Sequence, residues 1–170
     1  MNKKILYLDM DGVVADFEKK IGELQPEIKD FKSFEDINEL SEKIDLVCYA
    51  NPEIYHDLPP VPGAIEAVKK LYEIYEVYFL STAMWSLPAS FTGKRMWIEK
   101  HFGDLGKKKL ILTHRKDLMR GDFLVDDRTH NGAGQFEGEL LLFGSEKFPD
   151  WEVTLKYLIE VEKLSNSSSG

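Results

Sequence analysis

Polar side chains capable of catalysis follow four apolar runs of the chain, at the point where each run ends. The four groups are Asp9 and Asp11 after residues 5–8, Ser81 and Thr82 after 77–80, Lys116 after 110–112, and Asp126 and Asp127 after 123–125. In open α/β sheets, ligands bind outside the carboxyl ends of the strands. If the four runs are neighbouring parallel strands, all four groups meet at one edge of a sheet.

The adjacent carboxylates of Asp126 and Asp127 indicate a cation. Two like charges directly after a buried strand are costly unless a positive charge neutralises them. Every candidate ligand is an oxygen atom, which suits a hard divalent ion such as Mg²⁺, and the histidines and the cysteine show no zinc-type spacing. Taken alone, Asp9 and Asp11 with Gly12 are equally consistent with an acidic turn.

Hydroxyl groups and lysines supply the complementary chemistry for a phosphate. Ser81 and Thr82, which by default end a strand or cap a helix, are suited to hold phosphate oxygens together with backbone N–H groups. Lys116 alone is typical of a solvated surface, but opposite a carboxylate cluster its ammonium fits beside a phosphoryl group. Lys94, near the start of a predicted helix, is a second candidate of the same kind. Together these groups predict phosphoryl-transfer chemistry.

The overall charge limits the partners of the chain. Its 170 residues carry 30 acidic and 22 basic side chains, which gives a net charge of −8. Because an acidic protein repels polyanions, we do not expect a nucleic-acid polymer as a partner. A small phosphorylated substrate is compatible with this charge if cations gather at the site. The sequence leaves a homodimer open.

Neither a membrane span nor an internal disulfide is expected. No apolar stretch approaches the roughly 20 residues that a transmembrane helix needs, and the N-terminus shows no signal peptide. Cys48 is the only cysteine, and a small buried thiol is the favoured interpretation. We therefore expect a cytoplasmic protein.

Apolar runs alternate with helical patterns along most of the chain, which is typical of a parallel α/β sheet with helices on both faces. The predicted strands are 5–8, 77–80, 110–112, 123–125 and 139–143, and the predicted helices are 13–24, 64–75, 92–102 and 151–164. Ser33 with Asp36 predicts a further helix that ends near Ile44. The expected architecture is a Rossmann-like core (1–16 and 61–164), a small helical cap inserted after the first strand (17–60) and a disordered tail (165–170).

With these groups in this order, the chain resembles the phosphatases of the haloacid-dehalogenase (HAD) superfamily. Residues 9–16 match the first motif of that superfamily, Ser81 the second, Lys116 the third and Asp126-Asp127 the fourth. Within the superfamily the chain is most similar to the 5′(3′)-deoxyribonucleotidases, and this likeness is carried by 9–17, 58–68, Lys94, 97–103 and 126–128. One departure is His114, which stands where the animal members have an arginine.

The resemblance implies a magnesium-dependent mechanism with a covalent intermediate. Asp9 would attack phosphorus and form an aspartyl-phosphate, and Asp11 would act first as general acid and then as general base. The implied Mg²⁺ ligands are Asp9, the Asp11 backbone carbonyl, and Asp127 or Asp126, with Asp127 preferred. The implied substrate-binding and phosphate-binding residues are Asp11, Phe17, Ser81, Thr82, Lys94 and Lys116.

The cap would select the substrate, and the resemblance implies a nucleoside monophosphate. Phe17, Phe34 and Tyr49 offer flat apolar faces on which a base stacks, an interaction worth about 1–3 kcal/mol per base. Ordinary packing of the cap on the core explains the same residues equally well.

Three other functions are compatible with parts of the pattern. Another phosphatase of the superfamily would act on a sugar phosphate or a different small phosphomonoester. A signalling receiver domain also uses strand-end aspartates, a hydroxyl, a lysine and Mg²⁺, but there the acidic pair precedes a separate phosphorylated aspartate, the reverse of the order here. A catalytically silent binding module is disfavoured by the complete set of Asp9, Asp11, Ser81, Lys116 and Asp127.

Overall fold

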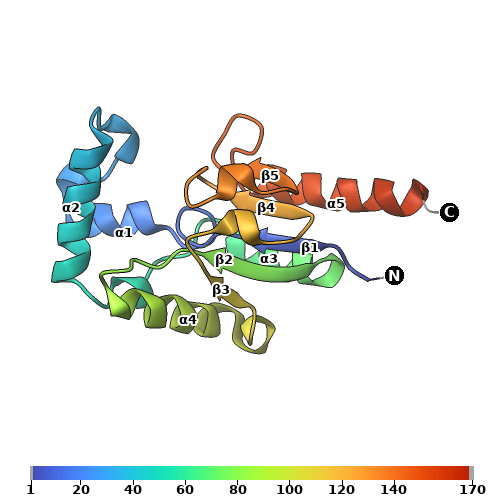
Figure 1. The fold of residues 1–170 in the computed structure, drawn as a ribbon, viewed down its shortest axis with the longest axis horizontal. Coiled ribbons are helices and arrows are strands. Elements are labelled where there is room, and N and C mark those ends of the chain that lie inside the picture. The colour runs from blue at the N-terminus through green and yellow to red at the C-terminus, as the bar shows by residue number, and fades with distance from the viewer. Residues whose placement is uncertain (1, 169–170) are drawn as a thin grey trace.

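The computed structural model describes residues 2–168 and contains a five-stranded sheet in which all neighbouring strands are parallel (Figure 1). The strands are β1 (Ile5–Leu8), β2 (Glu76–Ser81), β3 (Leu110–Leu112), β4 (Phe123–Asp126) and β5 (Glu139–Leu142), in the spatial order β3-β2-β1-β4-β5. The α/β class and the parallel sheet predicted from the sequence are confirmed.

The two faces of the sheet are covered differently. Leu6 and Phe79 point to the face that packs into the main core. The helices that contribute to that core include α3 (Ala64–Ile74), α4 (Pro88–Phe102) and α5 (Trp151–Ser168). On the opposite face, Tyr7 and Leu80 pack with Ala133, which starts a short 3₁₀ turn. The second face is therefore covered by turns of the chain, where the sequence predicts helices.

The segment between β1 and α3 holds two helices and, within the described residues, no strand of the sheet. The helices are α1 (Phe17–Leu24) and α2 (Ile37–Ala50), and 3₁₀ turns lie at 26–28, 31–33 and 54–56. In Figure 1 these helices stand beyond the carboxyl ends of the strands, at the left of the view. Residues 17–60 are called the cap segment below.

Two linkers join the cap segment to the rest of the chain, and hydrogen bonds tie the linkers together. The Asp16 N–H donates to the Pro59 carbonyl (2.7 Å), and the Val61 N–H donates to the Val14 carbonyl (2.9 Å). Such paired backbone bonds restrict the dihedral freedom of both linkers. The cap segment therefore starts from a fixed position above the sheet edge.

The turn after β1 replaces the first turn of a predicted helix. Three consecutive amide groups, those of residues 13–15, donate to the Met10 carbonyl at 2.9–3.1 Å and close a tight turn. Gly12 within this turn has a φ of +81°, a conformation that favours glycine. Helix α1 consequently begins only at Phe17, with the Asp16 carboxylate as its N-cap.

Three other helix boundaries differ from the sequence expectation. Helix α2 continues to Ala50, beyond the expected end near Ile44, and α4 begins at Pro88, where a proline in the first turn is well tolerated. Helix α5 runs to Ser168, so residues 165–168 are helical rather than disordered. The hydroxyl groups of its last two described serines donate to carbonyls one turn earlier, at 2.9 and 3.0 Å. The rest of the predicted tail, 169–170, lies outside the described residues.

Candidate active site

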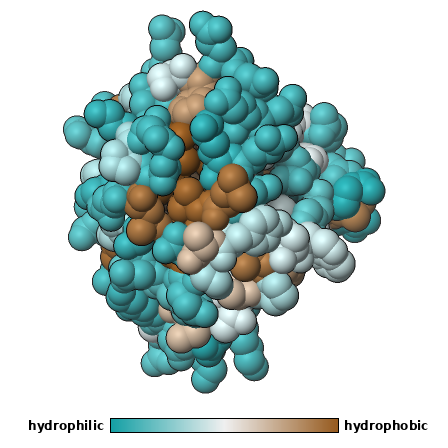
Figure 2. Space-filling view, turned by 90° about the vertical axis from the view of Figure 1, so that its left-hand side faces the viewer, coloured by the Kyte–Doolittle hydropathy of each residue, from teal (hydrophilic) through white to brown (hydrophobic). Residues whose placement is uncertain are grey.

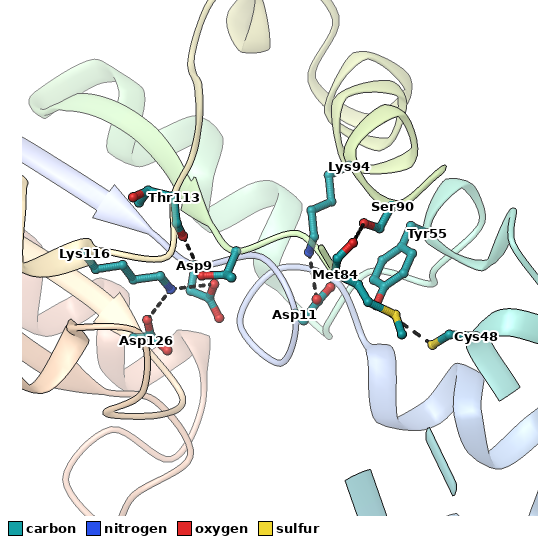
Figure 3. A network of polar contacts seen from close by, with 11 residues as sticks. Asp9, Asp11, Cys48, Tyr55, Met84, Ser90, Lys94, Thr113, Lys116 and Asp126 are labelled. Atoms are coloured by element: carbon teal, nitrogen blue, oxygen red, sulfur yellow. Dashed lines mark hydrogen bonds and ion pairs between the residues drawn. The ribbon is translucent and has the colours of Figure 1, made fainter. Parts of the chain in front are cut away.

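Asp9 is the first residue after β1 and is buried at the carboxyl edge of the sheet. Its backbone N–H donates to the Val125 carbonyl (2.9 Å), which extends the β1–β4 ladder by one residue and fixes its direction. Lys116 Nζ lies 3.0 Å from Asp9 Oδ1. A buried carboxylate thus faces a buried ammonium (Figure 3).

Lys116 lies between two carboxylates. Its Nζ is 2.6 Å from Asp126 Oδ2 in addition to its contact with Asp9. The Lys116 N–H donates to the Asn131 carbonyl (2.7 Å), which ties the turn after β3 to the turn after β4. Burial disfavours the charged ammonium, but the carboxylates of Asp9 and Asp126 outweigh it and raise the pKa of Lys116. The lysine therefore carries its positive charge at neutral pH.

Three carboxylates gather beside this lysine. One oxygen from each of Asp9, Asp126 and Asp127 lies within 4.8 Å of the other two. Burial, together with repulsion from the other two carboxylates, raises the pKa of Asp127 to about 8. Burial also raises the pKa of Asp9. Besides burial, the raised pKa values reflect mutual repulsion of the ionised carboxylates, which a bound cation would relieve.

The donor set fits a hard divalent cation, because its ligand atoms are all carboxylate oxygens. Asp126 already accepts hydrogen bonds from Lys116 and from the Arg128 N–H (3.0 Å). Asp127 instead approaches the turn after β1 closely: a Cβ at Gly12 would lie 2.2 Å from Asp127 Oδ2. The glycine therefore leaves room for the carboxylate that is least occupied by protein donors.

Asp11 lies apart from the three carboxylates and pairs with Lys94. Lys94 Nζ is 2.7 Å from Asp11 Oδ2 and 5.0 Å from the centre of the Tyr55 ring, and the lysine is buried although it lies on α4. The other carboxylate oxygen, Asp11 Oδ1, is buried without a hydrogen-bond partner among the described residues. A buried oxygen of this kind calls for a partner such as water or a ligand.

The two hydroxyl residues after β2 occupy different positions. Ser81 ends β2 and is buried beside β1, at the sheet edge that carries Asp9. The Thr82 hydroxyl donates to the Thr113 carbonyl (2.7 Å) and so ties the loop after β2 to the end of β3. Thr82 thus has a structural partner, whereas a phosphate-binding role for either residue stays a prediction.

Phe17 and Tyr49 lie in contrasting surroundings. Phe17 is only 8% exposed, stacks on Tyr55 (5.6 Å between ring centres, 13° between planes) and meets Phe31 edge-on. Tyr49 is about half-exposed, and its hydroxyl lies 2.7 Å from Ser86 Oγ. Packing within the protein explains Phe17 without a ligand, so its role in base stacking stays a prediction.

Comparison with known proteins identifies the family. A family model described as "5' nucleotidase, deoxy (Pyrimidine), cytosolic type C protein" matches residues 3–148. The chain belongs to this family. A protein of Vibrio phage KVP40 named as a 5′(3′)-deoxyribonucleotidase is 40% identical over 162 residues, which cover 95% of this chain and 88% of the phage protein. The mitochondrial 5′(3′)-deoxyribonucleotidase of Mus musculus is 30% identical over 164 residues, with 85% of this chain and 69% of that protein covered.

Solved structures agree with this family at the level of the fold. A haloacid dehalogenase-like family hydrolase from Xanthomonas campestris superposes with a TM-score of 0.56 at 10% identity, covering 98% of this chain and 99% of that one. The HAD-hydrolase YfnB from Bacillus subtilis, solved bound to magnesium, superposes with a TM-score of 0.55 at 9% identity, covering 93% of this chain and 99% of that one. This deoxyribonucleotidase-family chain is thus a phosphomonoester hydrolase, as its motifs predict, and its fold is the one seen in HAD hydrolases.

Within residues 2–168, no helix is both long and apolar enough to cross a membrane. The predicted cytoplasmic location and the homodimer stay predictions.

Proposed function

We propose that the chain is a Mg²⁺-dependent 5′(3′)-deoxyribonucleotidase that forms an aspartyl-phosphate on Asp9. The observation that carries the proposal is the position of the buried Asp9 carboxylate, with the Lys116 ammonium 3.0 Å from it and Asp127 in the same carboxylate cluster. Positive charge beside the nucleophile lowers the electrostatic cost of bringing a phosphate dianion to it.

The first step transfers the phosphoryl group to Asp9. A carboxylate oxygen of Asp9 forms a bond to phosphorus, the bond from phosphorus to the substrate's ester oxygen breaks, and the leaving alkoxide takes a proton from the Asp11 carboxyl group. Lys116 stabilises the charge on the phosphoryl oxygens, and Ser81 binds one of them. Lys94 orients Asp11 and offers the same ammonium to the phosphate.

The second step regenerates Asp9. A water molecule attacks the phosphorus of the aspartyl-phosphate, and the Asp11 carboxylate takes a proton from that water. The bond from phosphorus to the Asp9 oxygen then breaks and releases inorganic phosphate. Asp9 returns as a carboxylate and Asp11 as a protonated carboxyl group, so one Asp11 serves both steps.

Asp9, Asp127 and the Asp11 backbone carbonyl would hold the Mg²⁺ ion. The ion, when bound, neutralises charge on the carboxylates and on the phosphoryl oxygens. Asp126 positions Lys116 through its 2.6 Å contact. The magnesium in the Bacillus subtilis neighbour, which shares the fold, supports this assignment.

The cap segment would select the substrate. It follows β1, and its α2 reaches the loop between β2 and α4 through the contact of Tyr49 with Ser86. The cap segment therefore contacts a strand-end loop at the carboxyl edge of the sheet, the edge that carries Asp9. We assign residues 1–16 and 61–164 to the catalytic core and 17–60 to the cap.

A phosphate-release screen tests this function. The substrates are deoxy-UMP, deoxy-TMP, the matching ribonucleotides and a set of sugar phosphates, each with Mg²⁺ and with a chelator. We expect Mg²⁺-dependent release that is fastest with the deoxyribonucleotides, and none from a folded Asp9→Asn protein. Preference for a sugar phosphate would overturn the assigned substrate, and activity of the Asp9→Asn protein would overturn the assigned nucleophile.

A further inference from the structure

We propose that Trp85 determines substrate specificity, and that its exposed indole contacts the base of a nucleoside monophosphate whose phosphate is held at Asp9. The inference rests on the proposed function, because it names the residue that recognises one part of that substrate. Four observations carry it: the exposure of Trp85, the loops that it joins, the contact of the cap segment beside it, and the orientation of its neighbouring rings.

Trp85 differs from the other two tryptophans of the chain in its exposure. It is 80% exposed, whereas Trp97 is 0% and Trp151 2% exposed. A large apolar ring left in water forgoes the burial that stabilises the other two. Exposure alone does not distinguish a binding residue from an ordinary surface residue. The position of Trp85 relative to the strand-end loops and the cap segment makes this distinction.

Trp85 lies where two strand-end loops at the carboxyl edge of the sheet approach each other. It follows Ser81 by four residues, in the loop between β2 and α4, and its ring lies 6.2 Å from that of His114 in the loop after β3. His114 precedes Lys116 by two residues, which span at most about 7 Å of extended chain. The indole therefore lies beside the loop that carries the ammonium in contact with Asp9.

The cap segment meets the core at the same loop. The hydroxyl of Tyr49, on α2, lies 2.7 Å from the Oγ of Ser86, the residue after Trp85. Figure 2 views the molecule from the end that carries the cap segment and shows a band of apolar atoms enclosed by hydrophilic side chains. Trp85 thus stands where the cap segment and two strand-end loops converge.

The flat faces of Trp85 are not stacked against another ring among the described residues. Its two aromatic neighbours meet it at steep angles, His114 at 77° and Phe91 at 71°. Phe17, one of the three residues that the sequence suggests for base stacking, instead lies nearly parallel to Tyr55 and is 8% exposed. A planar base therefore finds a free stacking surface on Trp85.

Kinetics with and without a base provide the first test. The pair of substrates is deoxy-TMP and 2-deoxyribose 5-phosphate, which shares the sugar and the phosphate but has no base. Trp85→Ala should lower kcat/KM for deoxy-TMP by about 5- to 150-fold, the loss of one stacking contact, and leave the base-free substrate unchanged. Trp85→Phe, which keeps a flat ring, should restore most of the loss. An unchanged kcat/KM for deoxy-TMP, or an equal loss with both substrates, would overturn the inference.

A binding measurement separates this inference from the proposed function. Because Trp97 and Trp151 are buried, quenching of exposed tryptophan fluorescence reports on Trp85. In the Asp9→Asn protein, deoxy-TMP should quench this fluorescence saturably, 2-deoxyribose 5-phosphate should not, and an added Trp85→Phe change should abolish the signal. If the parent protein hydrolyses no nucleotide, the proposed function fails, yet base-dependent quenching still supports Trp85 as the base contact. If the parent hydrolyses deoxy-TMP and no quenching occurs, the inference about Trp85 fails alone.

Discussion

At the scale of a single residue, two features of the structure require glycine at position 12: a left-handed backbone conformation and a close approach of the Asp127 carboxylate. Its φ of +81° strains any residue with a Cβ, and a Cβ there would lie 2.2 Å from Asp127 Oδ2. Gly144 shares only the first requirement, because its φ is +85° but no atom lies within 4 Å of its ideal Cβ. Substitutions at these two positions therefore distinguish the effect of backbone strain from the effect of displacing the acidic cluster.

We predict that Gly12→Ala and Gly144→Ala each cost about 1–2 kcal/mol of stability from the left-handed backbone alone. Only Gly12→Ala should also displace Asp127 and raise the Mg²⁺ concentration for half-maximal activity, by at least about tenfold, or about 1.4 kcal/mol. Urea unfolding and Mg²⁺ titration of phosphate release measure the two effects. The same Mg²⁺ dependence in both variants would contradict a metal site that includes Asp127.

The meeting of the strand-end side chains at one edge could be predicted from the sequence, but the contact of Lys94 with Asp11 could not. Asp9, Lys116 and Asp127 converge as expected because the carboxyl ends of parallel strands meet at one edge. The contact of Lys94 with Asp11 depends on how α4 packs over the turn after β1, which periodicity does not reveal. Neither Tyr55 nor Trp85 stands out in the sequence, where they are two aromatic residues among many.

At the scale of the elements, two buried indoles hold the linkers of the cap segment. Trp151, on α5, donates from Nε1 to the Val13 carbonyl (2.7 Å), and Trp97, on α4, donates to the Leu58 carbonyl (2.8 Å). Each linker is thus attached to a different helix of the core. The position of the cap segment at the carboxyl edge of the sheet depends on both attachments.

We predict that Trp97→Phe destabilises the protein by about 1–3 kcal/mol, because the buried Leu58 carbonyl loses its donor. For a chain of this size, this lowers the melting temperature by about 2–12 °C. Trp85→Phe is the matched control and should change stability by less than about 0.5 kcal/mol, since that ring is exposed. Equal shifts of the two variants in thermal unfolding would show that the indole N–H does not anchor the linker.

The strands could be predicted more closely than the helix boundaries. A buried strand of a parallel sheet is a short apolar run with polar residues at its end, and this pattern is local. Helix starts depend on competing hydrogen bonds. Three amide groups donate to the Met10 carbonyl and form a tight turn, so α1 begins only at Phe17. The covering of the second sheet face by a turn at Ala133 is a long-range packing outcome and has no periodic signal.

At the scale of the whole molecule, the chain has a net charge of −8, and three of its carboxylates, those of Asp9, Asp126 and Asp127, lie close together at one site. We predict that Mg²⁺ stabilises the protein, because the ion binds the folded state and relieves this repulsion. At about 100 times its dissociation constant, the gain is about 2.7 kcal/mol, or about 5–11 °C in melting temperature. A chelator should reverse the shift, and Asp127→Asn should reduce it. An undiminished shift in that variant would place the ion elsewhere.

Stability should also depend on pH through His101. Burial lowers the pKa of His101 below its ordinary value of 6.5, and the ring packs on Trp97 at 4.3 Å between centres. The folded state binds a proton at His101 less readily than the unfolded chain does. The stability that His101 contributes is therefore complete above about pH 6.5, and it is lost as pH falls through the lower pKa of the folded state.

Urea unfolding at about pH 7.5 and about pH 5.5, on either side of the ordinary histidine pKa, measures this effect. The parent protein should lose more stability on acidification than His101→Gln. His130→Gln, on the exposed turn after β4, is the matched control and should keep the dependence of the parent. Parallel curves for the parent and His101→Gln would contradict the assignment.

The covalent step at Asp9 can be tested directly by stopping the reaction with acid during turnover of deoxy-TMP and Mg²⁺, and locating bound phosphoryl groups by peptide mass spectrometry. The predicted result is a phosphoryl group on the peptide that contains Asp9, absent from the Asp9→Asn protein. A phosphoryl group on a different residue, with Asp9 unmodified while phosphate is released, would contradict Asp9 as the nucleophile.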